Sequence, residues 1–152
     1  MALMEGVEFF ISKRVGKAMT DYTMIAEGDK IVVAVSGGKD SLTLLQVLRD
    51  RQRFVPVHYS LIAVHIDSGY PRSSAKELRV YFRKLNVEYE IVKTDAIRKS
   101  KPKDINCFWC SWNRRKELFL IANRLKANKV ALGHHKDDIA ETILMNMFFH
   151  GE

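Results

Sequence analysis

Cysteine, proline and long apolar runs are all scarce in this sequence. Its 152 residues include two cysteines and three prolines, and no stretch approaches the ~18 apolar residues that can cross a membrane. The N-terminus lacks the order of a secretory signal, because Glu5 comes early and no long apolar run follows. These absences argue against a disulfide-stapled secreted domain and against a membrane protein. We therefore expect a cytoplasmic chain with no membrane partner.

Acidic residues are also too few to balance the basic ones. The sequence has 25 Lys+Arg against 18 Asp+Glu, which gives a net charge of +7. The basic residues gather around positions 13–17, 49–53, 98–103 and 114–116. Several basic clusters on one small domain favour a polyanionic partner, most simply nucleic acid, although a generally basic protein would show the same balance.

The rest of the composition, with 47% hydrophobic and 28% charged residues, is typical of a globular domain. Apolar runs of strand length alternate along the chain with stretches of helical periodicity. The predicted strands cover residues 30–35, 60–66, 89–93 and 129–132, and the predicted helices cover residues 6–25, 40–50, 73–86, 113–128 and 137–149. This alternation predicts parallel strands with right-handed crossovers, and hence an α/β fold with a doubly wound, Rossmann-like parallel sheet.

The strand order that we expect is 3-2-1-4, which places a topological switch point beside the first strand. We divide the chain into an N-terminal helical segment, residues 1–29, and an α/β domain, residues 30–152. The sequence ends directly after its last predicted helix, whereas a sheet of this kind commonly adds a further strand. We therefore expect a natural chain that continues beyond Glu152.

A glycine-containing turn follows the first predicted strand. It consists of Ser36, Gly37, Gly38, Lys39, Asp40 and Ser41. Two glycines let the backbone turn tightly and approach a ligand, and the N–H groups at the start of the next helix favour an anion. The serine hydroxyls add donors, Lys39 adds a positive charge, and Asp40 either binds a cation or caps the helix. A plain strand-to-helix turn is the alternative, and the pattern matches neither the Walker nor the Rossmann glycine motif.

The order S-G-G-K-D-S resembles the pyrophosphate loop of the ATP-pyrophosphatase (PP-loop) superfamily. Two further stretches, CFWCSWNRRKELF and ALGHHKDDIAETILMNMFFHG, resemble the tRNA 2-thiocytidine synthetase group in order and spacing, so that the resemblance spans most of residues 11–151. It implies the adenine nucleotide alpha hydrolase type of α/β fold. It also implies that ATP is cleaved between its α and β phosphates to adenylate a carbonyl oxygen, with tRNA as the partner.

Cys107 and Cys110 form a C-x-x-C pair with three interpretations. They are a redox dithiol, half of a zinc site completed by His134 and His135, or ligands of an iron–sulfur cluster. The resemblance implies a [4Fe-4S] cluster held by this pair and one later cysteine, which the 152 residues do not contain. An iron without that third thiolate offers an open position for sulfide. We place Cys110 just ahead of a helix N-terminus, where the thiolate is favoured.

Further candidates follow the second and fourth strands at the same edge of the sheet. The resemblance implies that Gly133 and Asp138 face ATP, and that Asp138 shares Mg²⁺ with Asp40; Asp137 and Asp138 otherwise cap a helix. Backbone near Ala34 and His65 would frame adenine. Other side chains have two open roles each: Asp67 bonds a ribose or caps a turn, Arg114 and Arg115 hold RNA or phosphates or lie on a solvated face, and His134 and His135 are catalytic or merely loop residues.

The function that we predict is ATP-dependent tRNA thiolation, in which C2 of a pyrimidine, favouring cytidine, is adenylated and its oxygen is replaced by sulfur. Lys39, Asp40, Cys107, Cys110 and Asp138 are the expected catalytic residues. A cysteine desulfurase or sulfide is the expected sulfur donor, and a homodimer is among the states that the sequence allows. The alternatives are a nucleotide-binding sensor without catalysis, and a PP-loop ligase or amidotransferase acting on a small carbonyl substrate.

Overall fold

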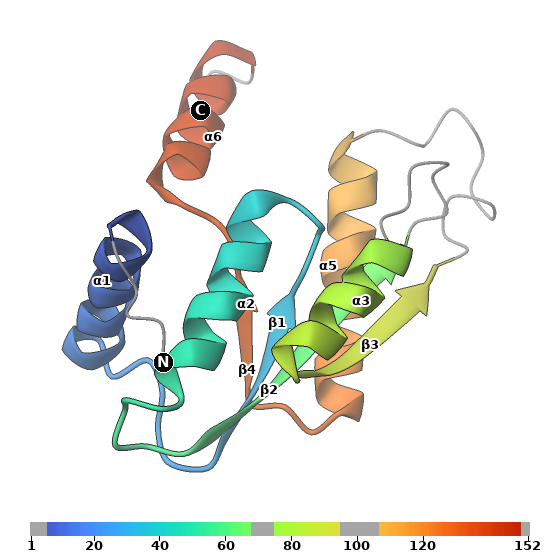
Figure 1. Ribbon diagram of the computed structural model, residues 1–152. Coiled ribbons are helices and arrows are strands. Elements are labelled where there is room, and N and C mark those ends of the chain that lie inside the picture. Colours follow the sequence, from blue (N-terminus) through green and yellow to red (C-terminus); the bar gives the residue numbers. More distant parts are fainter. Residues whose placement is uncertain (1–5, 68–74, 95–106, 150–152) are drawn as a thin grey trace.

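A four-stranded parallel sheet forms the centre of the molecule (Figure 1). The computed structural model describes residues 6–67, 75–94 and 107–149, and for residues 107–110 and 149 only the backbone. The strands are β1 (Asp29–Ala34), β2 (Tyr59–Asp67), β3 (Glu88–Lys93) and β4 (Lys129–Leu132), and the helices are α1 (Val7–Asp21), α2 (Lys39–Arg51), α3 (Ala75–Leu85), α5 (Cys107–Arg124) and α6 (Lys136–Phe149). The strand order β3-β2-β1-β4 confirms the predicted order and the doubly wound α/β fold.

The strand register brings the chemistry-bearing ends together. Ala34, the last residue of β1, pairs with Val64 on one side and with Leu132, the last residue of β4, on the other. All pairings are parallel, so the carboxyl ends of β1, β2 and β4 lie at one edge of the sheet. Two strands flank β1 there and lead to opposite sides, which is the switch point where doubly wound sheets bind ligands.

Both faces of the sheet are covered by helices. In β1, Val33 packs into a cluster with residues of α2 and α3, among them Leu45 and Phe82. Val32 points to the other face and packs into a cluster with Leu118 and other residues of α5. Alternate residues of β1 are therefore buried on opposite faces of the sheet, which explains why residues 31–34 are all apolar.

Helix α1 is attached to α2 through a glycine. A Cβ at Gly16 would overlap the guanidinium of Arg51, so the arginine can lie directly on the backbone of α1 because residue 16 is a glycine. Arg51 Nη1 donates to the Ser12 carbonyl oxygen at 2.9 Å and lies 3.3 Å from the Ser12 hydroxyl. Met19 adds a buried apolar contact to the main core cluster. The division of the chain at residue 29 stays a prediction.

The largest difference from the predicted elements is at α5. This helix begins at Cys107 rather than at residue 113, and it ends at Arg124 rather than at residue 128. No glycine or proline interrupts residues 107–124, so the helix extends back through both cysteines, whereas Lys126 has a φ of 54° that ends it early. Placing Cys110 ahead of the helix was therefore wrong: both cysteines lie in its first turn. The predicted start of α3, at residue 73, lies outside the described residues.

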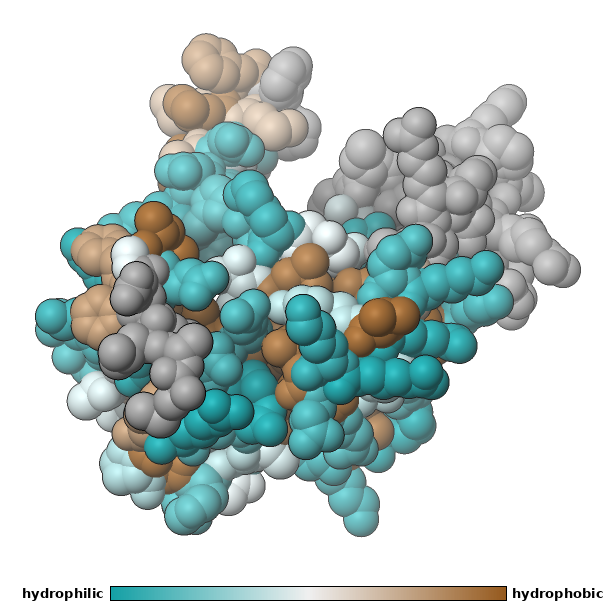
Figure 2. Space-filling view, in the orientation of Figure 1, coloured by the Kyte–Doolittle hydropathy of each residue, from teal (hydrophilic) through white to brown (hydrophobic). Residues whose placement is uncertain are grey.

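Helix α6 projects from the rest of the molecule (Figure 1). Its large apolar side chains are exposed, and they colour the top of the space-filling view brown (Figure 2). They are Ile139, Ile143, Leu144, Met145, Met147 and Phe148. Among the described helices, α6 included, none combines the length and the apolarity needed to cross a bilayer.

Candidate functional site: a cavity lined by a glycine turn and two arginines

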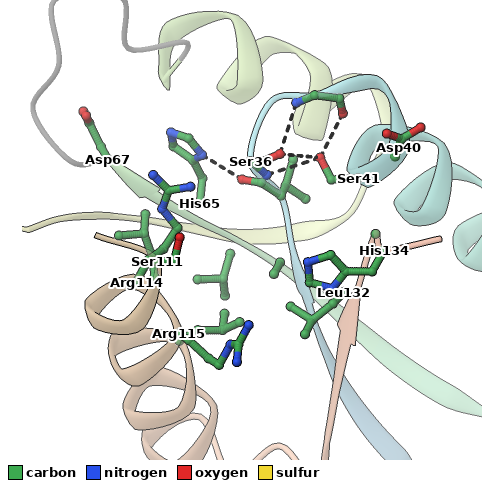
Figure 3. A pocket seen from close by; sticks show the side chains of 17 residues that line it. Ser36, Asp40, Ser41, His65, Asp67, Ser111, Arg114, Arg115, Leu132 and His134 are labelled. Carbon is green, nitrogen blue, oxygen red and sulfur yellow. Dashed lines mark hydrogen bonds between the residues drawn. The ribbon is translucent and has the colours of Figure 1, made fainter. Parts of the chain in front are cut away.

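A cavity of about 380 Å³ opens at the carboxyl edge of the sheet (Figure 3). Its volume is in the range of small-molecule sites. One wall is the turn after β1 together with the ends of β2 and β4, and the facing wall is α5. The lining residues are Ala34, Val35, Ser36, Gly38, Asp40, Ser41, Val64, His65, Ile66, Asp67, Ser111, Arg114, Arg115, Leu118, Leu132, Gly133 and His134.

The turn between β1 and α2 is held in shape by Ser41. Its side chain is buried, and its hydroxyl donates to the Gly38 carbonyl oxygen at 2.9 Å. The Ser41 hydroxyl oxygen also accepts from the Ser36 N–H and lies 3.2 Å from the Ser36 hydroxyl. The Ser36 hydroxyl in turn accepts from the Gly38 N–H at 3.3 Å. Gly37 has a φ of 96°, which favours glycine at this position. The two serines thus fix the turn from within.

Other amides of the turn are available for a ligand. Among the described residues, the N–H groups of Gly37, Lys39, Asp40 and Ser41 have no acceptor. Gly38 precedes α2 and gives it no side-chain cap, so the positive end of the helix dipole is open at this point. Backbone donors and a helix N-terminus together form a site for an anion such as a phosphate.

Lys39 and Asp40 form an ion pair beside the cavity. Their side-chain atoms are 2.8 Å apart, and Asp40 lines the cavity whereas Lys39 does not. The hydrogen bond from Lys39 lowers the pKa of Asp40, with a smaller contribution from His135, and the same bond raises the pKa of Lys39. The carboxylate is therefore ionised and able to bind a cation.

His65 and Asp67 line the cavity from the end of β2, and both are buried. His65 Nδ1 lies 2.7 Å from the Val35 carbonyl oxygen. Because a carbonyl oxygen only accepts, Nδ1 is the donor in this contact. Ala34 and His65 both line the cavity, and their contact with adenine stays a prediction.

Gly133 allows the loop after β4 to approach the start of α2. A Cβ at this position would lie 2.9 Å from both the Cα and the N of Ser41 and 3.0 Å from the carbonyl carbon of Asp40. The backbone at the start of α2 therefore occupies the space that a side chain at residue 133 would need, and the predicted contact of Gly133 with ATP stays a prediction. Gly133 still lines the cavity, beside the turn of residues 36–41.

His135 lies between the two carboxylates that were predicted to share Mg²⁺. Its ring nitrogens lie 3.9 Å from an Asp40 oxygen and 3.6 Å from an Asp138 oxygen, and Asp137 is 3.7 Å away. Asp138 also accepts the His135 backbone N–H at 2.7 Å. The described residues contain no group of three or more His, Cys, Asp or Glu placed to hold a metal ion. Asp138 and Lys39 lie outside the cavity lining, as does Gly37.

Helix α5 brings two arginines into the cavity. Arg114 and Arg115 both line the cavity from this helix (Figure 3). Ser111 and Leu118 share this face, and the sequence analysis named neither; Ser111 lies before residue 113, where the predicted helix began. Spacings of three and four residues from Arg114 and Arg115 would have found both. For the two cysteines the structure describes only the backbone, so an iron–sulfur cluster, a zinc site and a redox dithiol all stay possible interpretations of the pair.

Comparison with known proteins agrees with this geometry. A family model described as a PP-loop domain matches residues 9–151. The tRNA-cytidine(32) 2-sulfurtransferases of Shigella boydii serotype 18 and Citrifermentans bemidjiense are 45% and 43% identical to this chain, over 93% and 99% of it. This chain covers 47% and 61% of those two relatives, so it spans about half the length of the proteins that it matches.

Two solved structures share the fold. The U34-tRNA thiolase NcsA from Methanococcus maripaludis, solved with its [4Fe-4S] cluster, aligns over 95% of this chain and 50% of its own, with a TM-score of 0.81 and 24% identity. The NH3-dependent NAD synthetase from Campylobacter jejuni aligns over 90% of this chain and 60% of its own, with a TM-score of 0.62 and 18% identity. At these identities the likeness establishes the fold alone.

Proposed function

Because this chain belongs to the PP-loop family, we propose that it is the ATP-binding part of a tRNA thiolation enzyme. In this proposal the enzyme adenylates C2 of a pyrimidine, favouring a cytidine, and replaces its oxygen with sulfur. The observation that carries the proposal is the cavity itself. A turn with free amides forms one wall, and the helix whose first turn contains both cysteines forms the other.

The nucleotide would lie along the edge of the sheet. Backbone at Ala34 and His65 would frame the adenine, and the free amides between Gly37 and Ser41 would hold the departing pyrophosphate. Lys39, now paired with Asp40, would turn to the phosphates and neutralise the charge that develops as pyrophosphate leaves. The site binds and orients ATP so that the α-phosphorus faces the cavity.

Mg²⁺ suits the acidic side of this site. Carboxylate oxygens are ligands that magnesium prefers, and it usually takes one or two of them together with substrate phosphates and water. Asp40 and Asp138 both lie within 4 Å of His135, and these two carboxylates would be the protein ligands of the ion. When bound, the ion would stabilise negative charge on the phosphate oxygens.

Cys107 and Cys110 would be two of the thiolate ligands of a [4Fe-4S] cluster, and a third cysteine would come from outside these 152 residues. Bound there, such a cluster would supply the sulfur-transfer chemistry that the activated base needs. Both cysteines lie in the first turn of α5, where the helix dipole favours thiolates. Arg114 and Arg115, one turn further along, would hold the phosphate groups that reach the cavity.

The partners follow from this chemistry. The base must be presented unpaired, so an RNA loop is the fitting target, and a tRNA substrate is found in the cytoplasm. A cysteine desulfurase or free sulfide would supply the sulfur. We include a homodimer in the proposal as the oligomeric state.

The test is the tRNA of a strain that lacks the gene, complemented with the full-length protein. Mass spectrometry of digested tRNA is expected to show 2-thiocytidine with the wild-type gene and none with Asp40→Ala. Asp137→Ala is the matched control, because this exposed aspartate lies at the same edge outside the cavity lining, and it should retain the modification. Unchanged 2-thiocytidine in the deletion strain would contradict the proposal.

A further inference from the structure

Trp112 lies on α5 beside the cavity and is not used by the proposed chemistry. It directly follows Ser111, which lines the cavity, and it precedes Arg115, a second lining residue, by three positions. Residues three apart are neighbours on a helix surface, so the indole adjoins the arginine that reaches into the site. Even so, 54% of this large apolar residue is exposed.

A cation accompanies the exposed ring. Lys116 Nζ lies over the indole, 5.4 Å from the ring centroid. The ammonium group is therefore held next to a flat apolar surface. Together with Arg114 and Arg115 it forms three consecutive positive charges on a chain whose net charge is +7. An exposed aromatic ring with adjoining cations has the chemistry of a site for single-stranded nucleic acid, in which bases stack and phosphates pair with cations.

We infer that Trp112 stacks an unpaired RNA base next to the base that enters the cavity, with Lys116 pairing with the neighbouring phosphate. This inference rests on the proposed function, because it names where the tRNA loop contacts the site. Stacking requires no particular base, since every base has a flat face. Trp112 would therefore strengthen binding and position the loop without selecting its sequence.

The experiment uses the full-length protein carrying Trp109→Phe. This change removes the other tryptophan of the 152 residues, so that emission from this part of the chain comes from Trp112. Unmodified substrate tRNA is expected to quench that emission, whereas a fully paired RNA duplex is not. Filter retention measured alongside should show roughly tenfold weaker tRNA binding for Trp112→Ala and near-normal binding for Trp112→Phe.

Phe119→Ala is the matched control, because Phe119 is an equally exposed aromatic on the same helix and lies outside the cavity lining. It should leave tRNA affinity unchanged, and ATP affinity should be the same in all variants. If tRNA is retained but the emission of Trp112 does not change, or if Trp112→Ala binds as the wild type does, the inference fails and the proposed function stands. If the wild type retains no tRNA, both fail.

Discussion

The hydroxyl of Ser41 holds the turn of residues 36–41 in its shape. Its oxygen donates one hydrogen bond, to Gly38, and accepts from the N–H and the hydroxyl of Ser36. A hydroxyl has one donor and two acceptor positions, so Ser41 is fully used by the protein. In this structure its hydroxyl shapes the turn whose amides remain free, and its contact with phosphate stays a prediction.

Ser41→Ala is therefore expected to act through the shape of the turn. The change removes three hydrogen bonds and should lower the free energy of unfolding by about 1–3 kcal/mol. Because the amides lose their alignment, ATP affinity should fall roughly tenfold, which corresponds to about 1.4 kcal/mol. Chemical denaturation and calorimetric ATP titration measure the two effects. Ser60→Ala, at an exposed position of β2, is the control and should change neither.

Gly133→Ala is a steric test of the same region. The added Cβ would press on the backbone of Ser41 and Asp40, and backbone moves less easily than a side chain. The free energy of unfolding should fall by about 1–3 kcal/mol. Gly38→Ala is the matched stability control, because its Cβ would meet only the Ser36 hydroxyl, at 3.4 Å. Equal unfolding free energies for the two variants would contradict the close approach seen here.

At the level of elements, sequence patterns predicted what periodicity and topology control. The apolar run Ile31–Val35 and the helical repeats beside it were enough to give four strands, their order and the edge at which Ser36, His65 and Gly133 meet. The predicted start of α5 was wrong, because the residues C-F-W-C contain neither a helix cap nor a helix breaker that would mark where the helix begins. Contacts that depend on side-chain position, such as His135 between two carboxylates, leave no periodic signal in a sequence.

The attachment of α1 to α2 can be tested at Arg51. This side chain packs on Gly16 and donates to Ser12, and its long apolar stem also contributes packing. Arg51→Ala should lower the free energy of unfolding by about 1–2 kcal/mol and should speed proteolysis between α1 and β1. Arg53→Ala, an exposed neighbour, should do neither. Unaltered proteolysis of Arg51→Ala would show that α1 is held by other contacts.

Asp29 joins the start of β1 to the loop before β4, and it gives the fold a pH dependence. The Ala26 N–H bond at 2.7 Å holds the pKa of Asp29 below its usual range, with help from the Asn128 amide at 2.6 Å and from Lys129. A lowered folded-state pKa means that this stabilisation is complete above the unfolded value. It is lost as the pH falls through the folded value.

Stability should therefore change little between pH 7 and pH 5 on account of this group and should fall below about pH 4. In Asp29→Asn the same contribution is absent at every pH. The difference in unfolding free energy between wild type and variant should thus shrink on acidification, as measured by denaturant titrations from pH 7 to pH 3. A difference that stays constant would show that the carboxylate charge is unimportant.

The whole molecule combines a cavity at the carboxyl edge of its sheet with a net charge of +7. The cavity, the turn of residues 36–41 and the first helical turn of α5 all lie at the carboxyl edge of the sheet. The net charge of +7 favours approach of an RNA whose affinity should fall steeply with salt. The exposed apolar side chains lie along α6 (Figure 2), and the first turn of this helix reaches the edge through Asp138, which is 3.6 Å from His135.

The most direct test of the central claim is the pair of products formed from ATP by the full-length protein with tRNA and a sulfur source. Cleavage between the α and β phosphates predicts AMP and pyrophosphate in equal amounts, together with thiolated tRNA, and their loss in Asp40→Ala. Formation of ADP and phosphate instead, or ATP binding with no AMP under any of these conditions, would contradict the account.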